Sequence, residues 1–257
     1  MKILICGKGG SGKSTVSALL ARSMAKRGRK VLVIDTDESN FGLHRQLGME
    51  LPPDFMNRFG GKQAMTERLM EAFRRGEAVN VFDQKWEVDS IPDDYIHTKD
   101  GVKLLAIGKI HDFGEGCACP MGALSREFLK NLELKDDEVV IVDTDAGIEH
   151  FGRGVEDGCD LIIVVVDPSY ESLRLSLKIE ELAVSIKRPV YFILNKIDDE
   201  SRSIMLESLN QERVAGEIPS NREIFKASLE GRELDMRLDE IESLVDKLSM
   251  ETRGDNV

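Results

Sequence analysis

The sequence contains no apolar stretch that approaches the roughly 18 residues needed to cross a membrane, so we expect no transmembrane helix. It also lacks the apolar core of a signal peptide near its start, where a short strand-like run begins instead. Cysteine is scarce, and four cysteines in such a chain favour thiols or metal ligands over disulfides. These absences together predict a cytoplasmic protein with no membrane partner.

Basic side chains are the minority among the charged groups. The 257 residues include 35 Lys and Arg against 47 Asp and Glu, which gives a formal net charge of −12. A protein whose main partner is nucleic acid needs a basic surface, so we expect no nucleic-acid partner. Internal repeats and low-complexity linkers are also missing, and the length fits one large α/β domain.

Apolar runs with strand character alternate with helical patterns along most of the chain. The strand-like runs are residues 2–6, 30–35, 102–107, 138–143, 160–166 and 189–194. This alternation predicts an α/β fold with a mostly parallel sheet and helices on both faces. We expect one domain over residues 1–251 that includes an irregular insertion at 40–100, followed by a frayed tail at 252–257. Helices are expected near 62–75 and 232–249.

Residues 7–15 read GKGGSGKST and lie between an apolar run and a helical pattern. The spacing GxxxxGK[ST] in this context predicts a phosphate-binding loop, and therefore a nucleoside triphosphate ligand. Glycines let the backbone curl so that its N–H groups point at the phosphates, and the following helix adds its positive end. Lys13 is expected to reach the β- and γ-phosphates, and Ser14 to bind Mg²⁺. The loop residues expected to bind the nucleotide are Gly9, Gly10, Ser11, Gly12, Lys13, Ser14 and Thr15.

Two carboxylates that follow buried strands extend the predicted site. Asp143 comes after the apolar run 139–142, where a carboxylate can face Mg²⁺, and Gly147 offers a backbone N–H to the γ-phosphate. Asp37 follows the second strand and is a candidate for orienting the attacking water. The alternatives are an ordinary turn carboxylate for Asp143 and an N-terminal cap for Asp37.

Asn195 ends another strand, in the sequence ILNKID. An asparagine side chain at this place can hydrogen-bond an adenine edge with both its amide N–H and its carbonyl oxygen. The same letters resemble the NKxD guanine motif of GTPases. The residues alone therefore leave the base open.

An additional lysine, Lys8, gives the phosphate loop the pattern KGGxGKS. With Asp37, the Asp143–Gly147 stretch, Asn195 and the GEIP sequence at 216–219, this pattern resembles the deviant Walker A ATPases. That family contains MinD, ParA, ArsA and the nitrogenase iron protein. The resemblance spans nearly the whole chain and implies a P-loop NTPase that hydrolyses ATP, rather than GTP, to ADP and phosphate.

The same resemblance assigns roles to single residues. It implies a homodimer in which Lys8 reaches across to the partner's ATP, and a catalytic Asp37 that positions water. It also implies that adenine is held by Asn195 together with Ile218, Pro219 and the segment that follows.

Cys117 and Cys119 form a CxC pair just before a helical pattern. Two thiolates favour a soft metal such as zinc, copper(I) or nickel, or iron–sulfur chemistry, and the helix N-terminus favours the thiolate form. A closed site needs two more ligands, and we interpret His111 as an ordinary loop histidine. A homodimer with both pairs on its two-fold axis supplies four thiolates. The alternative is an incidental pair or a redox dithiol. Cys6 and Cys159 are interpreted as small buried hydrophobes.

The GCACP motif and the stretch DTDAGIEHFGRG at 143–154 together resemble CooC-type ATPases. These are the nickel-insertion accessory proteins of carbon monoxide dehydrogenase and acetyl-CoA synthase. The resemblance implies a Cys₄ site shared across an ATP-dependent dimer, Ni²⁺ as the delivered ion, and Zn²⁺ as a competitor. The nitrogenase iron protein carries a cysteine shortly after the corresponding stretch, whereas residues 148–157 contain none. An iron–sulfur electron donor is therefore disfavoured.

A second function class is a MinD/ParA-type positioning or regulatory ATPase without a metal role. A membrane tether would need a basic amphipathic helix at the C-terminal end. Residues 233–251 instead contain many acids, including Glu233, Asp235, Asp239 and Glu240. The sequence therefore favours the metallochaperone interpretation.

Overall fold

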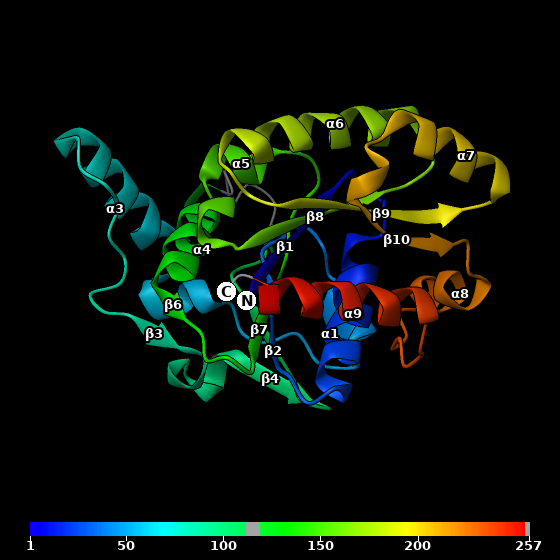
Figure 1. Ribbon diagram of the computed structural model, residues 1–257. Helices are drawn as coiled ribbons and strands as arrows, with labels where there is room; N and C mark the ends of the chain where they lie inside the picture. Colours follow the sequence, from blue (N-terminus) through cyan, green and yellow to red (C-terminus); the bar gives the residue numbers. More distant parts are fainter. Residues whose placement is uncertain (112–118, 255–257) are drawn as a thin grey trace.

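The computed structural model describes residues 1–111 and 119–254, and its centre is an eight-stranded sheet (Figure 1). The strands of this sheet are β1 (Lys2–Gly7), β2 (Lys30–Asp35), β4 (Ile96–Lys99), β5 (Val102–Ala106), β7 (Glu138–Asp143), β8 (Leu161–Val166), β9 (Val190–Ile197) and β10 (Val214–Pro219). Their order is β10-β9-β8-β1-β7-β2-β5-β4, and only the edge strand β4 runs antiparallel to its neighbour. The predicted α/β class and mostly parallel sheet are confirmed.

Helices cover both faces of the sheet. They are α1 (Lys13–Lys26), α2 (Leu43–Gln46), α3 (Gly61–Arg75), α4 (Cys119–Asn131), α5 (Glu149–Arg153), α6 (Tyr170–Ser185), α7 (Asp199–Ser208), α8 (Arg222–Glu230) and α9 (Asp239–Gly254). Figure 1 shows α6 and α7 on the opposite side of the sheet from α1 and α9. Short 3-10 turns and a parallel two-stranded pair, β3 (Trp86–Glu87) with β6 (Leu132–Glu133), complete the described chain.

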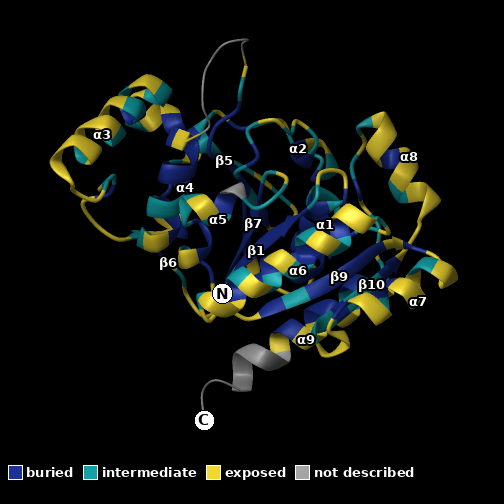
Figure 2. Cartoon of the chain, turned by 90° about the horizontal axis from the view of Figure 1, so that it is seen from above, coloured by how far each residue is buried: buried dark blue, intermediate teal, exposed yellow. Residues whose placement is uncertain are grey.

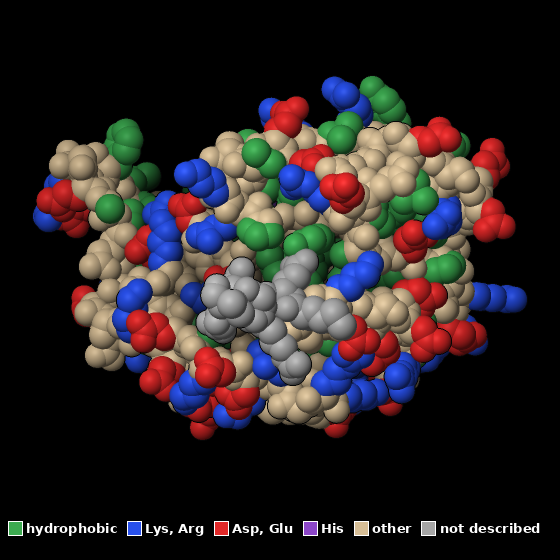
Figure 3. Space-filling view, in the orientation of Figure 1, with side chains coloured by type: hydrophobic (Ala, Val, Ile, Leu, Met, Phe, Trp, Pro, Cys, Tyr) green, Lys and Arg blue, Asp and Glu red, His purple; other side chains and the backbone are tan. Residues whose placement is uncertain are grey.

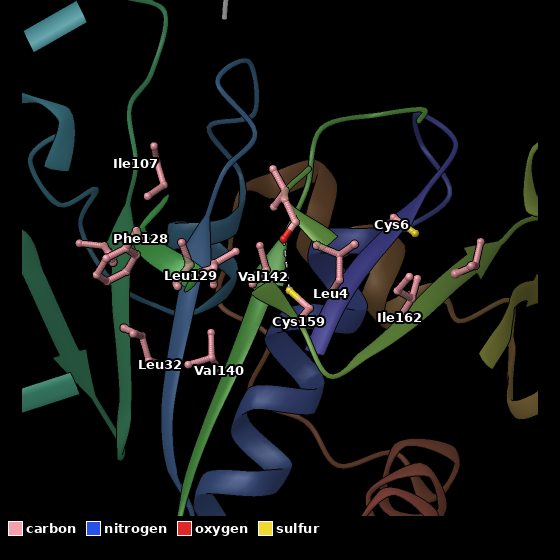
Figure 4. Close-up of a cluster of buried hydrophobic side chains, with 14 of the residues drawn as sticks. Leu4, Cys6, Leu32, Ile107, Phe128, Leu129, Val140, Val142, Cys159 and Ile162 are labelled. Carbon is pink, nitrogen blue, oxygen red and sulfur yellow. Dashed lines mark hydrogen bonds between the residues drawn. The ribbon is translucent and has the colours of Figure 1, made fainter. Parts of the chain in front are cut away.

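Successive side chains of a central strand point to opposite faces of the sheet, so a hydrophobic core forms on each face. In β1, Ile3 and Ile5 pack toward α1 and α9, whereas Leu4 and Cys6 pack toward α4 and α6. Cys6 and Cys159 are 0% and 1% exposed, as expected for small buried hydrophobes, and Figure 4 shows them within the second core. Burial raises the pKa of both thiols, that of Cys159 to about 12, so neither is disposed to ionise.

The segment that was expected to be an irregular insertion holds α2, α3 and the edge strand β4. Its core is a group of aromatic rings around Phe55, which meets Phe59, Trp86 and Tyr95 edge-to-face and Phe128 of α4 in a tilted arrangement. The helix predicted near 62–75 is present as α3, which stands away from the body with a largely exposed surface (Figure 2).

The closing helix starts later than predicted. It begins at Asp239 rather than near 232, and its first turn carries Asp239, Glu240 and Glu242, which complement the positive end of the helix. Residues 232–238 before it have no regular secondary structure, and the N–H of the buried Leu234 donates to the Gln46 carbonyl at 2.9 Å. The helix continues to Gly254.

No helix in the described ranges is both long and apolar enough to cross a bilayer. On the face shown in Figure 3, lysine and arginine side chains are interspersed with acidic ones. Many lysines and arginines of the described chain form ion pairs, such as Arg27 with Glu242 at 2.8 Å and Lys30 with Asp137 at 3.0 Å.

Candidate active site

The phosphate-binding loop connects β1 to α1 at the carboxyl edge of the parallel sheet. Gly10 and Gly12 have positive φ angles of 79° and 103°, which let the loop curl back on itself. The Ser11 N–H donates to the Lys8 carbonyl at 3.1 Å, and α1 starts directly at Lys13. The loop therefore presents backbone N–H groups and a helix N-terminus to one point, as anion binding requires.

Side chains with oxygen atoms that could bind a metal ion converge beside the start of α1. The Asp143 carboxylate accepts hydrogen bonds from Ser14 Oγ at 2.6 Å and from Ser17 Oγ at 2.8 Å. Asn40 Nδ2 donates to the same Ser14 Oγ at 2.7 Å. Asp143 is fully buried, and burial raises its pKa.

These donors suit Mg²⁺, which prefers hydroxyl, carboxylate and water oxygens. Ser14 and Asp143 are the residues that would hold the ion, and Asp37 lines the same cavity as Ser14. When bound, Mg²⁺ would neutralise charge on the β- and γ-phosphates. Ser17 was not anticipated as a partner of Asp143, although it lies one helical turn after Lys13.

Asp37 lies in a turn after β2 and lines the cavity. Its side chain is 8% exposed, and Oδ1 accepts hydrogen bonds from the backbone N–H and hydroxyl of Ser39 at 3.0 and 2.7 Å. One carboxylate oxygen thus stabilises the turn. The position agrees both with a role toward water and with the alternative of a local turn cap.

Gly147 closes the opposite side of the loop. Its N–H donates to the Gly7 carbonyl at 3.2 Å, so it would have to leave that partner to meet a γ-phosphate. Nearby, Arg153 pairs with Asp145 at 3.0 Å. His150 is 2% exposed, and desolvation lowers its pKa to about 3, so this ring is neutral.

A cavity of about 940 Å³ extends from the phosphate loop to α8. Among the predicted site residues, its lining includes Gly9, Gly10, Gly12, Lys13, Ser14, Thr15, Asp37, Asn195 and Pro219. Those outside the lining are Lys8, Ser11, Asp143, Gly147 and Ile218. Ile218 is 3% exposed and packs in the core below the cavity, so its side chain is part of the fold.

Asn195 supports the phosphate loop directly. Its Nδ2 donates to the Ser11 carbonyl at 2.7 Å, and a Cβ at Gly12 would lie 2.2 Å from the same nitrogen. The neighbouring Lys196 donates to the Gly10 carbonyl at 2.6 Å. One N–H of the amide group that was expected to read adenine is therefore engaged with the loop.

The far wall of the cavity is the segment after Pro219, which the family resemblance implied as part of the adenine site. It is formed by the start of α8, with Asn221, Arg222, Ile224 and Phe225 in the lining. Asn221 caps the helix by accepting from the N–H groups of Glu223 and Ile224. Phe225 is 68% exposed, which is unusual for a large aromatic ring and leaves a face available in the cavity. The sequence Asn221-Arg222-Glu223 could have predicted where this helix begins, because asparagine is a common N-terminal cap. The position of Phe225 beside the loop depends on the order of the strands in the sheet.

Lys8 points away from the cavity of its own chain. Its ammonium pairs with Asp167, which follows β8, at 3.2 Å. The side chain retains 34% exposure, so it can be reached from outside the chain. The contact to a partner's ATP stays a prediction.

Cys119 is exposed at the first position of α4, and Cys117 lies outside the described residues. Within residues 1–111 and 119–254, no group of three or more histidine, cysteine or acidic side chains is arranged to hold a metal ion. His111, the last residue of the first described range, contacts Asp54 Oδ2 through its Nε2 at 2.9 Å.

Comparison with known proteins agrees with this geometry. A family model described as the CobQ/CobB/MinD/ParA nucleotide binding domain matches residues 2–234. An uncharacterized ATP-binding protein of Methanocaldococcus jannaschii is 57% identical over 249 residues, which cover 97% of this chain and all of the relative. The carbon monoxide dehydrogenase accessory protein CooC of Rhodospirillum rubrum is 34% identical over 90% of this chain and 88% of its own.

Among solved structures, the septum site-determining protein MinD of Pyrococcus horikoshii in complex with Mg-ADP superposes with a TM-score of 0.72. The match covers 98% of this chain and 96% of that one at 19% identity, and it shows a shared fold. With a family model over most of its length and a CooC relative at 34% identity, the chain belongs to the CobQ/CobB/MinD/ParA nucleotide-binding family as a CooC-type P-loop ATPase.

Proposed function

We propose that this ATPase is a cytoplasmic metallochaperone, which hydrolyses ATP and dimerises to bind nickel and deliver it to carbon monoxide dehydrogenase or acetyl-CoA synthase. The observation that carries the proposal is the CxC pair, Cys117 and Cys119, in a chain 34% identical to a carbon monoxide dehydrogenase accessory protein. Nickel is the cargo in this proposal, with Zn²⁺ as a competing ion. ATP and Mg²⁺ belong to the cavity described above.

The ligand count argues for a shared site. Cys119 is at the exposed start of α4 and is disulfide-bonded in this structure, so the proposed metal site needs the reduced protein. One reduced pair supplies two of the four ligands that a closed tetrahedral thiolate site needs. A two-fold axis through the pairs doubles the ligands without further residues. Metal and ATP are then coupled, because each favours the dimer and linkage is reciprocal.

The test is a titration of Ni²⁺ or Zn²⁺ into anaerobically reduced protein, with mass measured in parallel. We expect one ion per dimer, and a steep loss of affinity in Cys117→Ser and Cys119→Ser because each removes two of the four ligands. Cys159→Ala is the matched control, since that thiol is 1% exposed and should not contribute. One ion per monomer, or a metal-bound monomer, would defeat the shared site.

The alternative is a MinD/ParA-type positioning or regulatory ATPase. It predicts an ATP-dependent dimer whose formation and mass are the same with and without metal. If wild-type protein binds neither Ni²⁺ nor Zn²⁺ more tightly than the double cysteine variant, the metallochaperone proposal is wrong and this alternative replaces it.

A further inference from the structure

Lys109 is a fully buried lysine that the sequence motifs do not identify. Its side chain is 0% exposed, and its ammonium donates to three oxygens. These are Asp35 Oδ2 at 2.7 Å, the Asp37 carbonyl at 2.5 Å and the Asn40 carbonyl at 2.6 Å. All three ammonium donors are therefore used inside the protein.

The three acceptors belong to the end of β2 and the turn that follows it. Asp35 Oδ1 also accepts from the Asp37 N–H at 3.2 Å, and the Ile110 N–H donates to the Glu38 carbonyl at 3.0 Å. Lys109 and Ile110, which follow β5, thus hydrogen-bond to four residues between Asp35 and Asn40. Apart from these contacts, the turn has its local hydrogen bonds and the contact of Asn40 with Ser14.

A gain in folding stability alone does not explain the buried pair of Lys109 with Asp35. A buried ion pair is often no more stabilising than apolar residues of the same volume, because both charges lose their hydration. Burial raises the pKa of Asp35 to about 7 even beside the lysine. Two of the three acceptors are backbone carbonyls, so Lys109 restrains the path of the turn as well as balancing a charge.

This turn carries two side chains that face the reaction site. Asp37 lines the cavity, and Asn40 Nδ2 contacts Ser14 Oγ at 2.7 Å. Lys109 binds the backbone carbonyl of both residues. A shift of about 1 Å in a positioning group can cost a factor of about 100 in rate.

We propose that Lys109 is a positioning residue for ATP hydrolysis, which holds the Asp37–Asn40 turn so that Asp37 faces the attacking water and Asn40 faces Ser14. In the reaction, the water oxygen bonds to the γ-phosphorus while the bond to the β–γ bridging oxygen breaks. ADP leaves with that electron pair, and the proton of the water passes to solvent. Lys109 touches none of these atoms and acts through the turn.

The test separates charge balance from positioning. Lys109→Met leaves Asp35 buried without a cation, so it should lower both Tm and kcat. The double variant Lys109→Met with Asp35→Asn removes both charges and should recover most of the Tm. Its kcat should stay about 10- to 100-fold below wild type, with the affinity for a fluorescent ATP analogue within about 3-fold.

Lys99→Met is the matched control. Lys99 also pairs with a carboxylate, that of Glu233, but lies on β4 away from the cavity lining. It should keep the wild-type kcat. If the double variant regains wild-type kcat together with its Tm, Lys109 merely neutralises Asp35 and the proposal fails. Normal kcat in Lys109→Met would overturn it as well.

Discussion

The Gly7→Ala substitution measures how tightly the phosphate loop is built into the sheet. Gly7 ends β1 with φ at +142°, and an added Cβ would lie 2.4 Å from the backbone carbonyl oxygen of Val165 in β8. Neither partner can rotate away, because both atoms belong to paired strands. The backbone strain costs about 1–3 kcal/mol, and separating the strands adds about 1–3 kcal/mol of overpacking.

Together these terms predict a loss of about 2–6 kcal/mol in the free energy of unfolding. In a chain of this size that lowers Tm by roughly 10 °C. ATP binding should weaken too, because the Gly7 carbonyl also accepts from the Gly147 N–H across the loop. Calorimetry and equilibrium binding of an ATP analogue give the two readouts.

Gly28→Ala is the control. Gly28 also has a positive φ, of 83°, but an added Cβ meets nothing within 4 Å. It should cost only the strain of a left-handed conformation, about 1 kcal/mol, and leave ATP binding unchanged. If Gly7→Ala and Gly28→Ala lower Tm by the same amount and both bind ATP normally, the close approach of β1 and β8 does not constrain the loop.

Other substitutions test single roles. Lys13→Ala should reduce hydrolysis to background in a phosphate-release assay, because the main positive charge facing the β- and γ-phosphates is lost. Asp37→Ala should slow hydrolysis while ATP stays bound, and normal turnover would exclude a role in positioning water. Lys8→Ala should bind nucleotide yet fail to form an ATP-dependent dimer in sedimentation; a normal dimer would count against the contact in trans. Burial raises the pKa of Glu156 to about 7, so the folded state keeps a proton that the unfolded chain releases near pH 4.5. The stability that Glu156 contributes should therefore fall as pH rises from 4.5 to 7, and Tm of Glu156→Gln should fall less steeply than wild-type Tm over this range; parallel profiles would refute it.

Much of the fold was predictable because its signals are local. The central strand β8 is apolar at every position and β7 at its four middle positions, as expected of strands buried on both faces. The two strands of the main sheet that were not predicted are at its edges. β4 reads IHTK and β10 reads VAGEIP, and neither carries a continuous apolar run because each has only one neighbour to pack beside.

The start of α9 shows how tertiary contacts override a local pattern. The sequence pattern predicts a helix from about residue 232, yet the helix begins only at Asp239. Leu234 is buried in the core that contains α1 and α9 residues, and its N–H donates to the Gln46 carbonyl. A partner nearly 190 residues away in sequence cannot be inferred from periodicity.

The sequence by itself determined the phosphate loop, since the strand, the glycines, Lys13 and the helix start are adjacent along the chain and their geometry follows from local backbone freedom. Only the tertiary structure decided what surrounds that loop. Asn195 meets Ser11, and Lys109 meets Asp35, because parallel strands order their carboxyl ends along one edge whatever the sequence distance between them. Such contacts depend on strand order and side-chain reach, which no short motif encodes.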